Sequence, residues 1–171
     1  AGFVPNRRTA RTYNPAQVWT QRMGDTTRTQ LTNTAYSHRS VTVSPDGRWI
    51  AFVADAQLRP DSVVQAERDS ISLLPFSMER DREVRNDADI FVIPATGGEP
   101  RRITNLPGSE GSIAWSPDSR QVSFVSSARR EENNRLWLVD LGGGEPRNLV
   151  GDWQYEPGSY EWMPNGDIVM N

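Results

Sequence analysis

A short turn sequence recurs along this chain at intervals that suit a repeat fold. Ser44-Pro45-Asp46-Gly47 returns as Ser116-Pro117-Asp118-Ser119 and, in a weaker form, as Met163-Pro164-Asn165-Gly166. Proline presets φ at the first central position of a turn, aspartate suits the second, and glycine closes a type I turn. Repeats spaced roughly 40–50 residues apart are typical of propellers and solenoids, so this recurrence constrains the fold more than any single element does.

A second repeated block lies between these turns. Val18–Thr32, Ile90–Thr104 and Leu136–Val150 align over 15 residues without a gap. The two later copies begin with an apolar run, turn at paired glycines, and return with a more polar run. This pattern predicts a β-hairpin whose first strand is buried and whose glycines supply the positive φ of a tight turn.

The two repeated units alternate, and together they predict propeller blades. The turn repeat is flanked by expected strands at 40–43 and 49–54, 112–115 and 121–126, and 159–162 and 167–170. Two successive hairpins make a four-stranded antiparallel meander, which is the unit of a propeller. The expected fold is therefore all-β: a partial, open β-propeller of about three blades' worth of strands over 18–171, after an extended tail at 1–17. Because closed propellers usually have four to eight blades, we expect two exposed sheet edges.

The first full blade is interrupted by an insertion at about 55–88. Ser44 and Ser116 are 72 residues apart, whereas Ser116 and Met163 are 47 apart. Long insertions on a rigid scaffold are either decorative or functional, so two interpretations stay open. The segment is a surface excursion, or it is a partner-binding or gating element.

A short helix is predicted inside the insertion, over 62–74. Four positions fall at helical spacing: Val63, Ala66, Ser70 or Ile71, and Leu74. Ser62 and Gln65 fit a capping box at the start, and Pro75 ends the helix. The following residues, 78–89, are densely charged with mixed sign and are predicted to form a solvated loop.

Composition excludes several classes of function. A net charge of −3 over 171 residues argues against a nucleic-acid partner, since phosphate binding needs a basic stripe. The absence of cysteine excludes disulfides and thiolate metal sites. No apolar run approaches the roughly 18 residues that a membrane span requires, so the chain itself is not expected to cross a membrane.

The repeats resemble the WD40-like Pro-Asp repeats of TolB-type propellers. The resemblance rests on SPDGRWIAF at 44–52 and GGEPRRIT at 97–104, and it extends over about 18–170. Such propellers occur in the TolB envelope protein, in tricorn-like proteases, ahead of amidohydrolase domains and in the prolyl oligopeptidase family. The insertion looks most like exported bacterial members of that last family, in which the propeller precedes an α/β-hydrolase domain and filters access to it.

The resemblance implies a fold and an exported location, and it implies no activity for these residues. The chain ends at Asn171, before any hydrolase domain, and its blade count is lower than that of a closed ring. It begins at Ala1 rather than Met, as it would after cleavage of a secretory signal or after trimming of the chain. We expect a periplasmic or otherwise exported bacterial envelope protein.

No catalytic, cofactor or metal site is predicted. The chain has no G-x-S-x-G nucleophile elbow, and its one histidine, His38, falls on a blade connector, where we expect a polar connector residue. Asp87, Asp89 and Glu83 form an acidic cluster that suits a hard cation, but the interleaved Arg82 and Arg85 favour ion pairing. Five aromatic residues at equivalent repeat positions are predicted as core between blades: Trp19, Phe91, Trp137, Phe52 and Phe124.

The sequence therefore predicts a non-catalytic, protein-binding or accessory subunit of a larger cell-envelope assembly, in a membrane or outside it. Its open edges, insertion and basic tail would contact the partner. The candidate partner-binding residues are Arg7, Arg8, Arg11, Trp19, Val63, Ile71, Leu74, Trp153 and Trp162. The alternative is the N-terminal propeller part of a secreted serine peptidase of the prolyl oligopeptidase family or of a propeller-bearing amidohydrolase. A third interpretation is a TolB-like interaction module in envelope transport.

Overall fold

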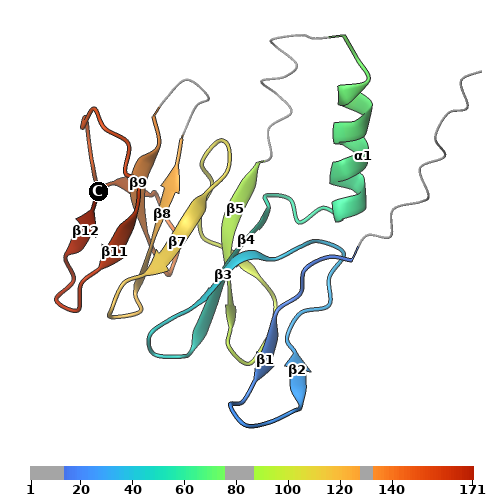
Figure 1. Cartoon of the computed structure of the whole chain (residues 1–171), viewed down its shortest axis with the longest axis horizontal. Helices are drawn as coiled ribbons and strands as arrows, with labels where there is room; N and C mark the ends of the chain where they lie inside the picture. Colours follow the sequence, from blue (N-terminus) through green and yellow to red (C-terminus); the bar gives the residue numbers. More distant parts are fainter. Residues whose placement is uncertain (1–13, 76–86, 128–132) are drawn as a thin grey trace, which may run out of the picture.

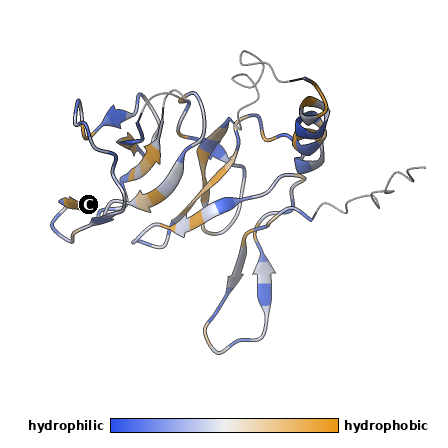
Figure 2. Cartoon of the chain, turned by 45° about the horizontal axis from the view of Figure 1, so that its top comes forward, coloured by the Kyte–Doolittle hydropathy of each residue, from blue (hydrophilic) through white to orange (hydrophobic). Residues whose placement is uncertain are grey.

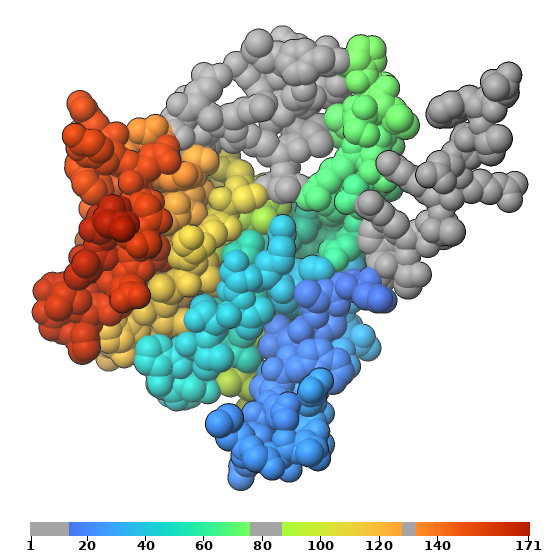
Figure 3. Space-filling view, in the orientation of Figure 1, coloured from blue at the N-terminus to red at the C-terminus, as the bar shows by residue number. Residues whose placement is uncertain are grey.

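The structure is a computed structural model that describes residues 14–75, 87–127 and 133–171. In these residues the chain forms four antiparallel sheets that follow one another in a fan (Figure 1). A space-filling view shows the same order as successive bands of colour across one face (Figure 3). The prediction of an all-β, open propeller with one helical insertion is confirmed.

The fan holds a half-blade, two full blades and a second half-blade. The first half-blade is β1 (Trp19–Gln21) with β2 (Arg28–Gln30). Blade one is β3 (Arg39–Val43), β4 (Trp49–Asp55), β5 (Ala88–Pro94) and β6 (Arg101–Arg102). Blade two is β7 (Gly111–Trp115), β8 (Gln121–Ser126), β9 (Arg135–Asp140) and β10 (Arg147–Asn148). The last half-blade is β11 (Tyr160–Trp162) with β12 (Ile168–Met170).

Blade one is buried on both faces because its strands alternate between two cores. Ile50, Phe52 and Ala54 of β4 face the β1–β2 half-blade, where they pack with Val18. The intervening residues of β4 and β5 face blade two and pack against its strands β7, β8 and β9: Ala51, Val53, Ile90 and Val92. Figure 2 shows the hydrophobic colouring running along the strands of the full blades, whereas the helix carries mixed colours.

The predicted inter-blade aromatics are confirmed except at Trp19. Phe52 and Phe124 are fully buried, and Phe91 is 3% exposed. Trp19, Phe91 and Trp137 all lie on the face that looks toward the preceding sheet of the fan, as the two cores show for Phe91 and Trp137. Trp19 is 53% exposed because no sheet precedes the β1–β2 half-blade within the described residues.

The repeated turns form as predicted and also contact each other across the blades. Ser44 Oγ lies 2.6 Å from Asp46 Oδ1 and accepts the Trp49 N–H at 2.9 Å, and Ser116 makes the same contacts in blade two. Gly47 closes the first turn with φ of 71°, whereas Ser119 takes the equivalent position with φ of 61°. A serine is tolerated there because its Oγ accepts the Asp46 N–H at 3.0 Å, which ties one turn to the other.

Substitutions at Ser119 should separate that hydrogen bond from the backbone strain. Ser119→Ala keeps the left-handed conformation that costs a non-glycine residue about 1–2 kcal/mol and loses the inter-blade bond. Ser119→Gly loses the same bond but relieves the strain. We expect the alanine variant to be less stable than the glycine variant by roughly 1 kcal/mol, as measured by urea denaturation. Equal stability of the two variants would contradict a strained position.

The described part of the insertion contains one helix, α1 (Asp61–Ser72), but its start differs from the prediction. The helix begins after Pro60, and no side chain caps it, so the predicted capping box of Ser62 and Gln65 is wrong. The carboxylate of Asp61 instead accepts hydrogen bonds from the backbone N–H and hydroxyl of Ser37, at 2.9 and 2.5 Å. The helix start is thus fixed by a tertiary contact, which a local sequence signal does not reveal.

Candidate functional site

The first candidate site is the pair of unpaired strand edges at the two ends of the fan. In the full blades the second and third strands pair most extensively, from Trp49↔Pro94 to Asp55↔Ala88 in blade one. By repeat position β12 is a second strand and β1 is a third strand. Within the described residues β12 pairs only with β11 and β1 pairs only with β2. Each half-blade therefore presents unpaired backbone N–H and C=O groups to whatever supplies the missing strands.

Two predicted aromatic anchors lie at these ends with much of their surface open. Trp19 of β1 is 53% exposed. Trp153, in the connector before β11, is 39% exposed and lies edge-on to Tyr155, with 5.7 Å between the ring centroids. Its backbone carbonyl accepts a hydrogen bond from Arg135 at 2.5 Å, which ties the connector to blade two. The role of both tryptophans in partner binding stays a prediction.

Trp162 points inward instead. It is half-buried, and its indole Nε1 donates to Ser123 Oγ at 2.8 Å. Ser123 is fully buried and also lies 3.1 Å from the hydroxyl of Tyr160. Burial raises the pKa of Tyr160 to about 12. Through Ser123 the last half-blade is attached to blade two, so Trp162 offers less surface to a partner than we expected.

Removing the Ser123 hydroxyl should loosen this attachment. Ser123→Ala leaves the Trp162 N–H without its acceptor in a partly buried position, which costs about 1–3 kcal/mol. The matched control is Ser126→Ala, on the same strand and 1% exposed, because the one contact of its hydroxyl within the described residues is a long one, 3.4 Å to the Ser109 carbonyl. We expect the first variant to lower the free energy of unfolding more than the control. An equal loss in both would contradict a specific role for Ser123.

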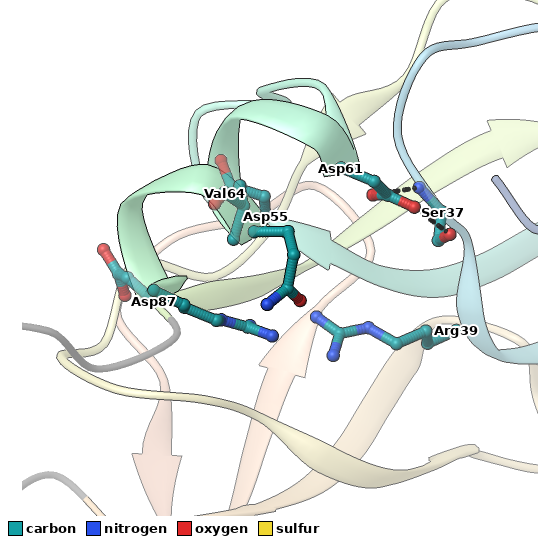
Figure 4. Close-up of a pocket in the computed structure, with 8 residues that line it drawn as sticks. Ser37, Arg39, Asp55, Asp61, Val64 and Asp87 are labelled. Carbon is teal, nitrogen blue, oxygen red and sulfur yellow. Dashed lines mark hydrogen bonds between the residues drawn. The ribbon is translucent and has the colours of Figure 1, made fainter. Parts of the chain in front are cut away.

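The second candidate site is a pocket of about 230 Å³ where α1 meets the start of β3 (Figure 4). Charged and polar side chains line it: Ser37, Arg39, Asp55, Asp61, Val64, Gln65, Arg68 and Asp87. Asp55 is held by Arg59 at 2.8 Å, and Arg59 also pairs with Glu67 of α1 at 2.8 Å. Although burial opposes it, these hydrogen bonds from Arg59 bring the pKa of Asp55 below its usual value.

The other predicted residues of the insertion lie away from this pocket. Val63 is 44% exposed and Ile71 is half-buried, and both line a shallow hollow on another face of α1. Leu74 is 52% exposed and lies beyond the end of the helix. Their role in partner binding stays a prediction. The basic tail residues Arg7, Arg8 and Arg11 lie outside the described residues.

A pair of buried acids lies at the start of β5 and just before β7. Asp89 is fully buried, forms an ion pair with Arg102 and lies 3.4 Å from Thr104 Oγ1. Glu110 is 4% exposed, and neither of its carboxylate oxygens has a hydrogen-bond partner within the described residues. Burial, and then repulsion from Asp89, raise the pKa of Glu110 to about 9, and burial raises that of Asp89 to about 6. Glu110 is therefore held as a neutral acid near pH 7.

The position of Asp89 shows that the solvated loop predicted at 78–89 is wrong at its C-terminal end. Asp89 belongs to β5 and pairs with Arg102 of β6, so it is a core residue rather than a loop residue. Glu83, Arg82 and Arg85 of the predicted cluster lie outside the described residues. Among the residues that the structure does describe, no three metal-ligating side chains come together.

His38 is a buried residue rather than the polar connector residue that we expected. It is 5% exposed, and its ring lies 4.5 Å from that of Phe52 and 5.1 Å from that of Tyr36. Its Nδ1 is 3.0 Å from the Ala16 carbonyl oxygen, and burial lowers the pKa of His38. The connector folds inward here because it passes between two packed sheets.

His38 and Glu110 occupy the same position in successive repeats. Each precedes by two residues a serine with φ of 49°, Ser40 or Ser112. Each donates its backbone N–H across to the preceding outer hairpin, His38 to Ala16 at 2.8 Å and Glu110 to Ala88 at 3.0 Å. The constant spacing of the two repeats was the sequence signal for this shared position, but the pattern alone did not show that the position is buried.

No family model matches the chain. Over 132 residues it is 29% identical to a protein described as "Protein TolB homolog" from Chlorobium luteolum, which covers 69% of this chain and 30% of that protein. Over 135 residues it is 30% identical to a "Probable dipeptidyl-peptidase 5" from Aspergillus terreus, which covers 75% of this chain but 17% of that protein. The chain thus spans less than a third of the length of these two relatives.

Solved structures show the same fold. The crystal structure of TolB from Acinetobacter baumannii superposes on 90% of this chain with a TM-score of 0.59, at 18% sequence identity, and 31% of that structure is covered. A structural match at 18% sequence identity is evidence for a shared fold and for nothing more. None of the described helices is long and apolar enough to cross a membrane.

Proposed function

The chain has the TolB-like propeller fold, and we propose that it is a non-catalytic, protein-binding module. Its open sheet edges, its insertion and its N-terminal tail contact a larger assembly of the cell envelope. TolB-like propellers host unrelated activities, so the proposal rests on surfaces of this chain and not on the fold.

The unpaired edges of β1 and β12 carry the proposal. An extended segment that pairs with such an edge gains main-chain hydrogen bonds, and neighbouring side-chain pockets provide specificity. The exposed ring of Trp19 lies on β1 and that of Trp153 lies in the connector before β11, and tryptophan is enriched among residues that contribute most to binding. A partner that supplies two strands at either end would complete a four-stranded blade.

The arrangement around His38 supports a non-catalytic role. Its Nδ1 faces a backbone carbonyl, and its ring is packed between Tyr36 and Phe52. A general base needs a nucleophile within hydrogen-bond reach. His38 borders a pocket with Thr32, Thr34 and Glu99, but its described hydrogen bond is to a backbone carbonyl and not to a nucleophile. An exported location and an envelope partner, in a membrane or outside it, are part of the same proposal and draw support from the TolB homologue among the relatives.

A second candidate is the propeller part of an exported peptidase. The match to dipeptidyl-peptidase 5 proteins over 75% of this chain favours it. In that case the strands that complete the two half-blades come from the same polypeptide, and the propeller stands beside a catalytic domain. The insertion would then face the route to that domain.

Native mass spectrometry of the protein, isolated gently from its source, tests both proposals. A species of 19.2 kDa in a stoichiometric complex with other chains is the result expected for a binding module. A much heavier single polypeptide that contains this sequence would support the peptidase candidate. A stable monomer of 19.2 kDa, with no bound chain, would overturn both proposals.

A further inference from the structure

The two half-blades of the fan are complementary, because each has the strands that the other lacks. By repeat position β1 and β2 are the third and fourth strands of a blade, whereas β11 and β12 are the first and second. In both full blades the second strand pairs antiparallel with the third, β4 with β5 and β8 with β9. Figure 1 shows the half-blades at opposite ends of the fan, so within one copy they lie apart. Taken from two copies, they have the four strands of one blade, which we call a composite blade.

The observed strand pairing shows how β12 lines up with the second strand of blade two. Ile168 lies opposite Trp162, as Val122 lies opposite Trp115. Ile168 therefore takes the position of Val122, and Asp167 takes the position just before it. The turn that precedes β12 is one residue shorter than its counterpart in blade two, so the pairing, rather than a count from the turn, gives the register.

Opposite charges face each other across a composite blade in this register. In blade two Gln121, just before Val122, lies opposite Asp140, and its side-chain amide donates to that carboxylate at 2.7 Å. Asp167 takes the position of Gln121, and the ungapped alignment of the outer hairpins puts Arg22 at the position of Asp140. Both side chains are exposed. A carboxylate directly opposite a guanidinium group on the neighbouring strand stabilises such a pairing.

Exposed apolar side chains also border the place of the missing strands. Four of them lie on β1, β3 and β12 and are 45–56% exposed: Trp19, Val41, Val43 and Val169. Phe91, the counterpart of Trp19, is 3% exposed, and Trp115, the counterpart of Val43, is 6% exposed. The Trp115 indole reaches the Thr42 carbonyl of the adjoining blade at 3.4 Å. In a composite blade, β11 and β12 of one copy would cover β3 of the other in the same way, and blade two would cover Trp19.

We propose that two copies of this chain join head to tail at both ends, with each β12 paired to β1 of the other copy. The two composite blades and the two full blades of each copy then form a closed ring of six blades. That number lies within the range of roughly four to eight that closed propellers usually have. A head-to-tail contact whose rotation closes leaves no free edge, so assembly stops at two copies. The inference rests on the proposed function in taking the open edges as binding edges, and it names their occupant.

Sedimentation velocity of the purified 171-residue chain, without any other protein, tests this inference. We expect a dimer of twice the chain mass of 19.2 kDa. Arg22→Glu puts two negative charges opposite each other in both composite blades, and Asp167→Arg puts two positive charges there. Each variant alone should raise the dissociation constant of the dimer about tenfold. An equal mixture of the two variants should recover the original value, because every introduced charge then faces an opposite one.

The matched control is Arg147→Glu, which reverses an exposed arginine on β10, the outer strand of blade two. This variant should dimerise as the unchanged chain does. An unchanged chain that stays monomeric, or that forms species larger than a dimer, would overturn the inference. A dimer that neither reversal weakens, or that the mixture does not restore, would overturn it as well. A monomer in this experiment leaves the proposed function standing, because that function is tested on the complex isolated from its source.

Discussion

Glu110→Gln is expected to stabilise the protein by roughly 2–4 kcal/mol at pH 7. Burial between the blades, and repulsion from Asp89, raise the pKa of Glu110 from an ordinary value of 4.5 to about 9. Between these two pH values the folded chain keeps a proton that the unfolded chain has lost. Stability therefore falls as the pH rises from about 4.5 to 9, and a neutral amide of the same shape removes that loss.

Urea denaturation between pH 4.5 and pH 9, followed by tryptophan fluorescence, measures the effect. The difference between the variant and the unchanged protein should be near zero at pH 4.5 and should grow with pH. Glu145→Gln is the control, since this glutamate is exposed in the turn before β10, and surface substitutions usually change stability by less than about 0.5 kcal/mol. A Glu110→Gln variant with an unchanged pH profile would contradict the buried neutral acid.

Arg102→Ala is expected to destabilise the protein by about 2–4 kcal/mol at pH 7.5. Asp89 is fully buried, and its ion pair with Arg102 holds its charge in the core. Even with this pair, burial raises the pKa of Asp89 to about 6, so loss of the guanidinium group raises that pKa further. Because a protonated Asp89 needs no counter-ion, the loss should be smaller at pH 5 than at pH 7.5.

The double variant Asp89→Asn with Arg102→Ala separates charge from packing. Asparagine keeps the shape of the side chain and its contact with Thr104 but carries no charge, so much of the lost stability should return. The free energy of unfolding of both single variants and the double variant is measured at the two pH values. Additive losses, with no recovery in the double variant, would show that the ion pair does not govern stability here.

The two inter-blade junctions contain different titratable residues, although the repeat gives them the same backbone geometry. The junction between the first half-blade and blade one contains His38 packed on Phe52. The next junction contains Glu110 beside Asp89. The same backbone bridge crosses both, from His38 to Ala16 and from Glu110 to Ala88. Repeat architecture thus fixes the position, while the residue that occupies it decides how that junction responds to pH.

Much of the fold could be predicted from the sequence because its signals are local. The turns at Ser44 and Ser116 follow from the preferences of proline and aspartate within four residues. The strands around them alternate or run apolar over short segments, and the observed bounds of β4 and β8 agree with prediction within one residue. The blade count, and hence the two open edges, follows from repetition of these local units.

The sequence by itself therefore determined the blades, their order and the helix in the insertion. The tertiary structure alone decided the buried state of His38, Asp89 and Glu110, the inward turn of Trp162 and the pocket around Arg39. Each depends on the sheet or helix packed against it, since burial and the pKa of a group are set by neighbours that are distant in the chain. A hairpin pattern in the sequence predicts which residues form a strand. Which charged side chains are buried depends on the blade that packs against that strand.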